Sequence, residues 1–301
     1  MERRPPDPKS TPTVAERRRL LDVNRAAAMF YRRQLLQAKN NWATNYLAAA
    51  GAREVLDPSS KWAIGYAPDA RSRLVDSLRS RGFDQSSVRN AGLALLNPEG
   101  RTIDRFRDHL VLPARNDRLE TVGFVGVRTT PEAYYVTSPE TQVHRRSAAI
   151  LGVAEQLDLL SEGATPVLVN DVLDAFAVER ISRLTVGRWA GIPLCDRLLS
   201  VEQARILARY AASDTVIIAV RDTQTAQRAA VGFVDDLSRF FVRVWAAELP
   251  TRSSIDASAN DQQALHDALL TTRPLADYRG SRRRRRYAAL DSGLAGPVPE
   301  L

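Results

Sequence analysis

From Thr165 onward, short apolar segments alternate with amphipathic ones, and this alternation limits the possible fold more than any other feature of the sequence. The apolar segments are typical of strands buried on both faces of a sheet: "PVLVN", "RLTVGRWAG", "DTVIIAV" and "VRVWAAELP". The segments between them have the apolar spacing of helices: "DVLDAFAVERIS", "SVEQARILARYAA" and "TAQRAAVGFVDDLSRFF". This order predicts an α/β unit in which helices cover a parallel sheet.

In sheets of this kind, ligands bind outside the carboxyl ends of the strands. The expected strands place Asn170–Asp171, Arg188–Gly191 and Arg221–Thr223 at a common rim. Two carboxylates on alternate residues of a strand end point the same way and can hold Mg²⁺. In Arg221-Asp222-Thr223 only the middle residue is acidic, so this rim suits a phosphate better than a metal ion. The alternative is that Arg221 is an ordinary solvated surface residue.

The half before Thr165 has a different pattern, which predicts an α+β unit. The segment "VAERRRLLDVNRAAAMFYRRQLLQAKNNWATNYLAAAGA" predicts two helices joined near residues 39–41, with Gly51 as a C-cap. Two further helices are expected in "ARSRLVDSLRSRGF" and in "DQSSVRNAGLAL", where Asp84 is the candidate N-cap. Between Phe106 and Ser138, β-forming residues interrupted by proline, glycine and Asn-Asp predict a meander of strands.

Most of the positive charge lies at the two ends of the chain. The chain carries a net charge of +8, of which residues 1–20 contribute +3 and residues 273–301 contribute +4. Residues 21–160 carry +4 and residues 161–272 carry −3. We therefore expect four parts: a disordered basic arm at 1–20, an α+β subdomain at 21–160, an α/β subdomain at 161–272 and a disordered arginine-rich tail at 273–301.

Several classes of protein are disfavoured by the composition. One cysteine, Cys195, and three histidines provide neither a disulfide framework nor a Cys/His zinc site. The sequence has neither a long uncharged apolar run nor the apolar segment of a signal peptide, so we expect a cytoplasmic protein without a membrane span. The four tryptophans lie in apolar helices or strands, which favours core packing over base stacking.

Seven short motifs occur in an order that resembles the polymerase core of bacterial DnaG-type primases. They are "AAAMFYRRQLL", "YLAAAG", "WAIGYAP", "AGLAL", "DRFRDHLVLPARND", "VGFVG" and "SPET", and the resemblance spans roughly residues 24–255. It implies an α+β N-terminal subdomain followed by a Toprim α/β subdomain. It also implies DNA-directed synthesis of RNA primers, with Mg²⁺ as cofactor.

The resemblance transfers the family's basic residues onto this chain unevenly. Arg107 in "FRDHLVLP" matches the first arginine of the family's basic ridge, whereas the usual second basic residue is His109. The arginine after the glycine-rich turn is displaced by one position to Arg128, and the usual lysine before "SPET" is Tyr134. The family's lysine after "SPET" falls at Arg146, with Arg145 beside it. Arginine keeps the charge that attracts phosphate, although it is not equivalent to lysine.

The acids implied by the family are largely replaced. The glutamate that ends the first strand of the α/β subdomain is Asn170 here, while a later acid is kept as Asp174. The family's pair of aspartates on the third strand aligns with Arg221-Asp222-Thr223. Past the fourth strand, Asp256 keeps one acid and Ser254 replaces another. The resemblance therefore implies a degenerate metal site, in which we assign no metal ligand and no catalytic residue.

Three functions follow from this combination. The first is a primase-family protein that binds single-stranded or primed DNA in replication or mobile-element transfer, without efficient primer synthesis. We expect Arg107, Arg128, Arg145 and Arg146 to contact nucleic acid, together with the tail arginines Arg282, Arg283, Arg284, Arg285 and Arg286. The second is an active, divergent primase in which Mg²⁺ binds Asp171, Asp174, Asp222 and Asp256. The third is a non-catalytic protein-interaction module. A helicase or another replication or transfer protein is the expected partner.

Overall fold

An antiparallel sheet in the order β1-β4-β5-β6 forms the centre of the N-terminal unit. The computed structural model describes residues 7, 10–38, 41–129, 133–185, 188–195, 199–221, 234–249 and 259–275. The four strands are β1 (Gly65–Ala67), β4 (His109–Arg115), β5 (Thr121–Thr129) and β6 (Ala133–Thr137). A second antiparallel pair is made by β2 (Ala94–Leu96) and β3 (Thr102–Asp104). The strand meander expected from the sequence is confirmed.

Helix α1 (Val14–Gln37) covers one face of this sheet. It begins with a capping box, in which the Thr13 hydroxyl accepts from the Glu16 amide and the Glu16 carboxylate accepts from the Thr13 amide. Its apolar side packs with α3 (Arg73–Ser80) and α4 (Gln85–Asn90) in one buried cluster. The chain passes from α1 to α2 (Trp42–Ala49) close to residues 39–41, as predicted, and Asp84 is the N-cap of α4.

The C-terminal unit is a sheet in the order β11-β10-β9-β7-β8. The strands are β7 (Thr165–Val169), β8 (Trp189–Pro193), β9 (Thr215–Arg221), β10 (Arg243–Leu249) and β11 (Arg273–Pro274). The first four pair in parallel, and β11 is antiparallel to β10. The helices in and beside this unit are α5 (Leu157–Ser161), α6 (Val172–Leu184), α7 (Val201–Tyr210), α9 (Val234–Leu237) and α10 (Ala259–Leu270). The predicted α/β alternation is confirmed.

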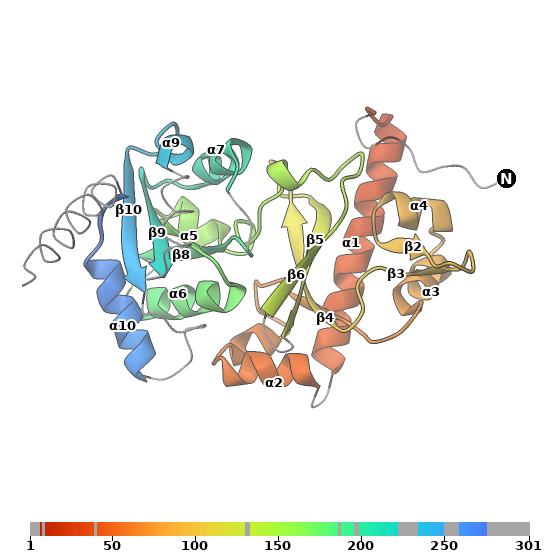
Figure 1. Cartoon of the computed structure of the whole chain (residues 1–301), viewed down its shortest axis with the longest axis horizontal. Coiled ribbons are helices and arrows are strands. Elements are labelled where there is room, and N and C mark those ends of the chain that lie inside the picture. Colours follow the sequence, from red (N-terminus) through yellow and green to blue (C-terminus); the bar gives the residue numbers. More distant parts are fainter. Residues whose placement is uncertain are drawn as a thin grey trace, which may run out of the picture.

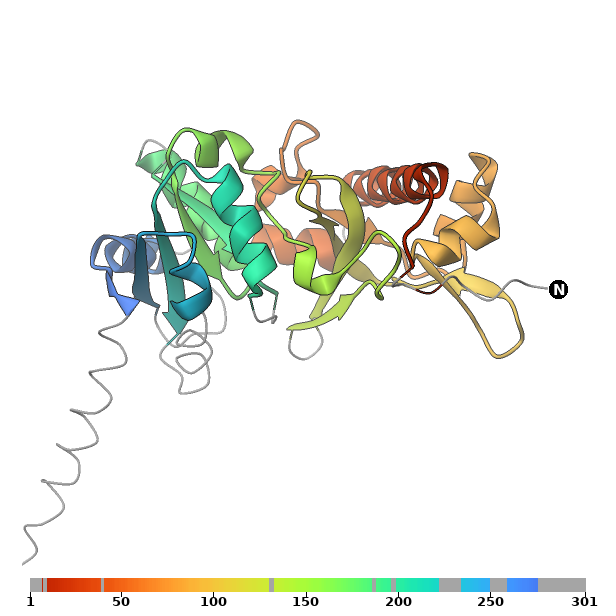
Figure 2. The same ribbon diagram turned by 90° about the horizontal axis from the view of Figure 1, so that it is seen from above.

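Alternate residues of the parallel strands enter two different cores. Val167 and Val169 face α6 and α10, whereas Leu168 faces α5 and α7. The first of these cores continues into the N-terminal sheet, where Trp62 meets Phe176 of α6 edge to face at 4.7 Å between ring centroids. Figure 1 shows the consequence: the two units lie side by side along the long axis, and α1 lies on the side of the N-terminal sheet away from the C-terminal unit. Figure 2 shows the same order from above.

Several boundaries differ from those expected. Residues 14–20, assigned to the disordered arm, are the first turns of α1, because the capping box starts the helix at Val14. At the other end, Arg273–Pro274 pairs with β10 and the Leu275 side chain is buried, so residues 273–275, assigned to the tail, belong to the folded C-terminal unit.

Three expected elements also have different ends. Helix α6 continues to Leu184, so β8 begins at Trp189 and not at Arg183, because the amphipathic spacing runs through "ERISRL". The helix expected up to Leu95 ends at Asn90. Gly92, which follows, has a positive φ of 74°, and Ala94–Leu96 is a strand. The helix expected up to Phe241 ends at Leu237.

Candidate nucleic-acid interface

A pocket of about 270 Å³ lies at one end of the N-terminal sheet and has a predominantly basic lining. Asp69, Arg105, Arg107, His109 and Arg128 line it. Arg105 and Arg107 belong to the turn before β4, His109 is the first residue of β4, and Arg128 is the last residue but one of β5. The structure therefore brings together two of the predicted contact residues, Arg107 and Arg128. We call this group of five residues the arginine pocket.

Asp108 fixes the position of Arg128. Its backbone has a φ of 55°, in the left-handed region that aspartate tolerates better than most residues. This conformation points the carboxylate towards α2 and β1, where its Oδ1 accepts from the Trp42 indole and, at 2.8 Å, from the Tyr66 hydroxyl. Its Oδ2 pairs with the Arg128 guanidinium at 3.0 Å. The arginine is therefore held in place before any ligand arrives.

The positive charge of the pocket comes from its arginines alone. Burial lowers the pKa of His109, and the hydrogen bond of its Nδ1 to the Arg107 carbonyl offsets this only in part. His109 is therefore neutral at pH 7, so the second basic position of the ridge has no charge. Three arginines against Asp69 leave the lining at +2, with Asp108 behind it partly balancing Arg128.

Arg105 and His109 each have an unsatisfied polar atom. The Nε of Arg105 and the Nε2 of His109 are buried without a hydrogen-bond partner among the described residues. A buried polar group without a partner costs about 1–3 kcal/mol. Burial also lowers the pKa of Arg105. Both residues also line the pocket.

Arg145 and Arg146 lie at the opposite end of the same sheet, so the predicted basic residues form two separate groups. Both are exposed, at the start of the 3₁₀ turn η2 (Arg146–Ala148). The Gln203 side chain of α7 donates to the Arg146 carbonyl at 3.1 Å. The pKa of Glu202 is lowered, first by its hydrogen bond from Arg205 and to a smaller extent by the charge of Arg145.

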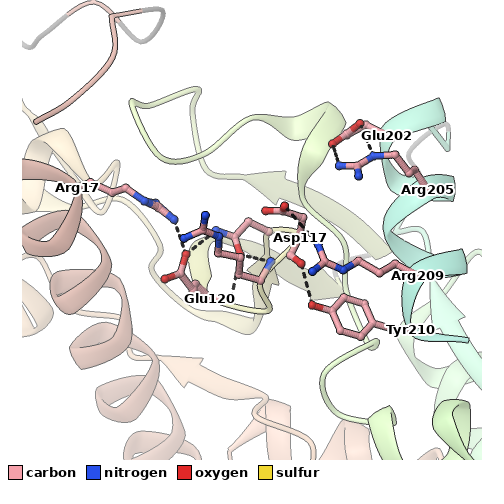
Figure 3. A network of polar contacts seen from close by, with 9 residues as sticks. Arg17, Asp117, Glu120, Glu202, Arg205, Arg209 and Tyr210 are labelled. Carbon is pink, nitrogen blue, oxygen red and sulfur yellow. Dashed lines mark hydrogen bonds and ion pairs between the residues drawn. The ribbon is translucent and has the colours of Figure 1, made fainter. Parts of the chain in front are cut away.

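Polar contacts join the two units at this second end. Figure 3 shows them running from α1 through the turn between β4 and β5 to α7. Arg17 pairs with Glu120 at 2.5 Å, and the Tyr210 hydroxyl donates to the Asp117 carbonyl at 2.7 Å. Arg209 lies 3.8 Å from the Asp117 carboxylate. These contacts fix the turn between the units on the side away from the arginine pocket.

Asn170 and Arg221 lie at the carboxyl edge of the parallel sheet, as predicted. Asn170 directly follows β7 and is exposed, and the backbone of Arg221 ends β9 opposite Leu249 of β10. The prediction for Arg188 is wrong. Its carbonyl accepts from the Thr165 amide, which places Arg188 at the amino end of β8, on the opposite edge. The cause is the extension of α6, which shifts the start of β8 to Trp189.

Asp171 and Asp174 are buried between the two units. Asp171 is the N-cap of α6, accepts from the Leu173 amide at 2.8 Å and accepts from the Tyr135 hydroxyl at 2.9 Å. Asp174 is only 1% exposed. Burial, followed by the charge of Asp171, raises the pKa of Tyr135, and Tyr46 is affected in the same way. These carboxylates therefore belong to a buried cluster with two tyrosines.

The described residues do not fit a magnesium ion at the carboxyl edge. Among them no group of three or more His, Cys, Asp or Glu side chains is arranged to hold a metal. Asn170 offers only an amide, the Asp171 carboxylate is used by its cap and by Tyr135, and Glu248 pairs with Arg273 at 3.3 Å. The predictions for Asp222, Thr223 and Asp256 lie outside the described residues, as do those for Arg282–Arg286.

Sequence reasoning missed Arg105, Asp69 and the role of Asp108. A signal for Arg105 was present, since "RFRDH" alternates basic and other residues before a strand, which places Arg105 and Arg107 on one side. Asp69 gave no comparable signal. The left-handed conformation of Asp108 is not encoded by any local motif and depends on Trp42 and Tyr66, which are distant in the sequence.

Three comparisons place this geometry among known proteins. Residues 30–157 match the family model described as the DNA primase catalytic core, N-terminal domain. The DNA primase of Geobacillus stearothermophilus is 31% identical over 239 residues, which cover 78% of this chain and 38% of that protein. The chain thus spans about two fifths of the length of that relative.

Solved structures give the same result over most of the chain. The RNA polymerase domain of the Mycobacterium tuberculosis primase DnaG has a TM-score of 0.69 and 25% identity, covering 87% of this chain and 86% of that one. The same domain in complex with a double-stranded DNA oligomer with a 6-nucleotide overhang has a TM-score of 0.68 and 26% identity, covering 87% and 82%. Separately, none of the helices in the described part of the chain is long and apolar enough to span a membrane.

Proposed function

Because this chain belongs to the family of DnaG-type DNA primases by sequence and by fold, we propose that it binds single-stranded or primed DNA without efficient synthesis of RNA primers. The setting we propose is replication or the transfer of a mobile element, with a helicase or another replication or transfer protein as partner. The relative from Mycobacterium tuberculosis was solved with an overhanging DNA duplex, which supports DNA as the ligand.

The observation that carries the proposal is the place of the arginine pocket beside the carboxyl edge. Tyr134 and Tyr135 are neighbours on β6, and successive strand residues point to opposite faces. Tyr134 lies opposite Arg128 of the pocket, whereas the Tyr135 hydroxyl donates to Asp171 at the start of α6. The pocket and the start of α6 therefore lie against opposite faces of β6, which is the outer strand of its sheet, so a DNA strand held on the pocket's arginines reaches the edge that carries Asn170 and Arg221 by passing over β6.

The described residues of the same edge do not form the metal site that primer synthesis needs. Nucleotidyl transfer requires a cation that neutralises the charge on the reacting phosphate and lowers the pKa of the attacking hydroxyl. Mg²⁺ takes this role through carboxylate and water oxygens at about 2.0–2.1 Å. Asn170 replaces one family acid, and Asp171 and Asp174 lie in the buried cluster with the two tyrosines. The residues at this edge can hold a DNA phosphate, and those that the structure describes there form no group of carboxylates arranged to hold the metal.

Fluorescence anisotropy with a labelled single-stranded oligonucleotide tests the binding. We expect the affinity to fall with salt, and we expect Arg107→Ala and Arg128→Ala each to reduce it about fivefold to tenfold and to lower the salt slope by about 0.7. Arg79→Ala, on an exposed arginine of α3 outside the pocket, is the matched control and should change neither quantity. Absence of binding at low salt would leave the protein-interaction module as the remaining function.

A primer-synthesis assay tests the chemistry separately. The full chain is incubated with a single-stranded template, ribonucleoside triphosphates and Mg²⁺ or Mn²⁺. We expect no template-dependent oligoribonucleotides above the background of a protein-free reaction. Products that require both template and metal would contradict this part of the proposal and establish the divergent active primase.

A further inference from the structure

Tyr134 lies beside two residues of the arginine pocket, His109 and Arg128. The residue is the second of β6 and lies directly opposite Arg128 of β5, so the two side chains lie on the same face of the sheet. It is 40% exposed, whereas the other rings around it are almost completely buried. A tyrosine thus stands where the resemblance implies a lysine, and the charge at this position is exchanged for an aromatic surface.

This ring is the outer end of a chain of aromatic contacts that begins in the core. Phe124 meets Phe106 at 6.3 Å, Phe106 meets His109 at 6.4 Å, and His109 meets Tyr134 at 5.8 Å and 87° between ring planes. The first three rings are each no more than 8% exposed. Tyr134 is therefore supported from below by packed rings, while its outer surface is in contact with water.

The ring is also held from the side. The hydroxyl of Tyr134 lies beside the guanidinium of Arg128, and this contact is the first cause of the raised pKa of that arginine. Arg128 is in turn paired with Asp108, which is held by Trp42 and Tyr66. A ligand that uses Tyr134 therefore does not have to immobilise a freely rotating side chain, which makes binding less costly in entropy.

We propose that Tyr134 and the arginine pocket form a nucleotide subsite, in which the arginines hold a DNA phosphate and the Tyr134 ring stacks on the adjoining unpaired base. This inference rests on the proposed DNA binding. Each base presents a flat π-face, so the subsite accepts any base but requires it to be unstacked from its own strand. A base within a duplex is covered by its neighbours. The subsite thus favours single-stranded DNA over duplex DNA.

The experiment compares oligonucleotides that differ only in their bases. Anisotropy is measured with labelled oligothymidylate and with an abasic strand that has the same number of phosphates. The native chain should bind oligothymidylate roughly tenfold more tightly than the abasic strand. Tyr134→Ala should reduce the affinity for oligothymidylate to the abasic level, and Tyr134→Phe should keep most of the difference. Because Tyr134 is exposed, the Ala variant should unfold at the same temperature as the native chain, which circular dichroism checks.

Two further variants separate base recognition from phosphate attraction. Tyr134→Lys should bind both strands equally well and show a steeper salt dependence, since it exchanges a ring for a charge. Arg107→Ala should weaken the binding of both strands by the same factor. Equal affinity of the native chain for the two strands, with Arg107 still required, would overturn the subsite and leave the DNA-binding function intact. Failure to bind either strand would overturn both.

Discussion

Asp171 distinguishes most clearly between the two alternatives, a DNA-binding protein without primer synthesis and an active, divergent primase. An active primase would use its carboxylate as a metal ligand, whereas the structure uses it as the N-cap of α6 and as the acceptor of the Tyr135 hydroxyl. Loss of an N-cap costs about 1 kcal/mol, and a hydrogen bond to a charged group contributes about 1.5–3 kcal/mol. We therefore expect Asp171→Ala to lower the free energy of unfolding by about 3 kcal/mol.

Two more variants assign this loss to its causes. Asparagine caps helices as well as aspartate does, so Asp171→Asn should cost only about 1 kcal/mol. Tyr135→Phe removes the donor of the hydrogen bond to the charged carboxylate and should cost about 2 kcal/mol. The double variant Asp171→Ala, Tyr135→Phe should cost about 2 kcal/mol less than the sum of the single variants, because both remove the same bond.

The assay is equilibrium unfolding in urea, with and without Mg²⁺. We expect the midpoints to change with the substitutions and to be the same with and without the ion. The reasoning is refuted if Asp171→Asn is as destabilising as Asp171→Ala and, in addition, Mg²⁺ stabilises the native chain but not Asp171→Asn. That result would show that the carboxylate binds the metal and that its contact with Tyr135 contributes little.

Two other predictions concern α1 and α3. Gly65→Ala should lower the free energy of unfolding in urea by about 3 kcal/mol or more, because an added Cβ would lie 2.5 Å from the Tyr31 Cβ and 2.7 Å from the Arg32 amide nitrogen of α1. Gly100→Ala is the control, since its added Cβ has open space and only the φ of 75° costs about 1 kcal/mol. A loss for Gly65→Ala no larger than that of the control would contradict the predicted clash. Burial raises the pKa of Asp104 from 3.8 to about 6, so the native state takes up the proton before the unfolded chain does, and stability falls as the pH rises through 6. As the pH rises from about 5.5 to 7.5, ionisation of Asp104 should lower the free energy of unfolding by about 0.8 kcal/mol, and Asp104→Asn should lack that part of the pH dependence. An identical dependence of the unfolding free energy on pH for both proteins would show that the pKa of this carboxyl is not raised.

The parts of the fold that the sequence predicts are those with a strong local pattern. The strands β7, β9 and β10 are continuous apolar runs, and the capping residues of α4 and α6 stand directly before their helices. The boundaries that were wrong lie where two patterns overlap. In "ERISRLTVGRWAG" the helical spacing continues into residues that also suit a strand, and only the pairing of Trp189 with Thr165 determines where β8 begins.

The sequence predicted the site residues only where the relevant property, the charge of the side chain, does not depend on neighbouring residues. Arg107 and Arg128 carry charge wherever they are placed, so sequence reasoning could select them. Their grouping with Arg105, and their separation from Arg145 and Arg146 by the length of β5, depend on the strand register. His109 shows the opposite limit, because its neutrality results from burial by residues that are distant in the sequence. Burial likewise turned Asp171 from a candidate ligand into a structural group.

Both the rim and the arginine pocket thus lack charges that the family resemblance implies. At the rim, Asn170 stands where the family resemblance implies an acid, and Arg221 replaces another, so negative charge that would hold a metal is absent from the described edge. In the pocket, Tyr134 and the neutral His109 stand where basic residues are implied, so positive charge that would orient a triphosphate is reduced, while Arg105, Arg107 and Arg128 remain. A phosphodiester carries one negative charge, and arginines bind it without a metal ion. A triphosphate undergoing transfer needs basic residues that orient it and a metal ion that neutralises its charge. Under the proposed function, the charges that remain retain a DNA strand, and the charges absent from the described residues are those that would extend one.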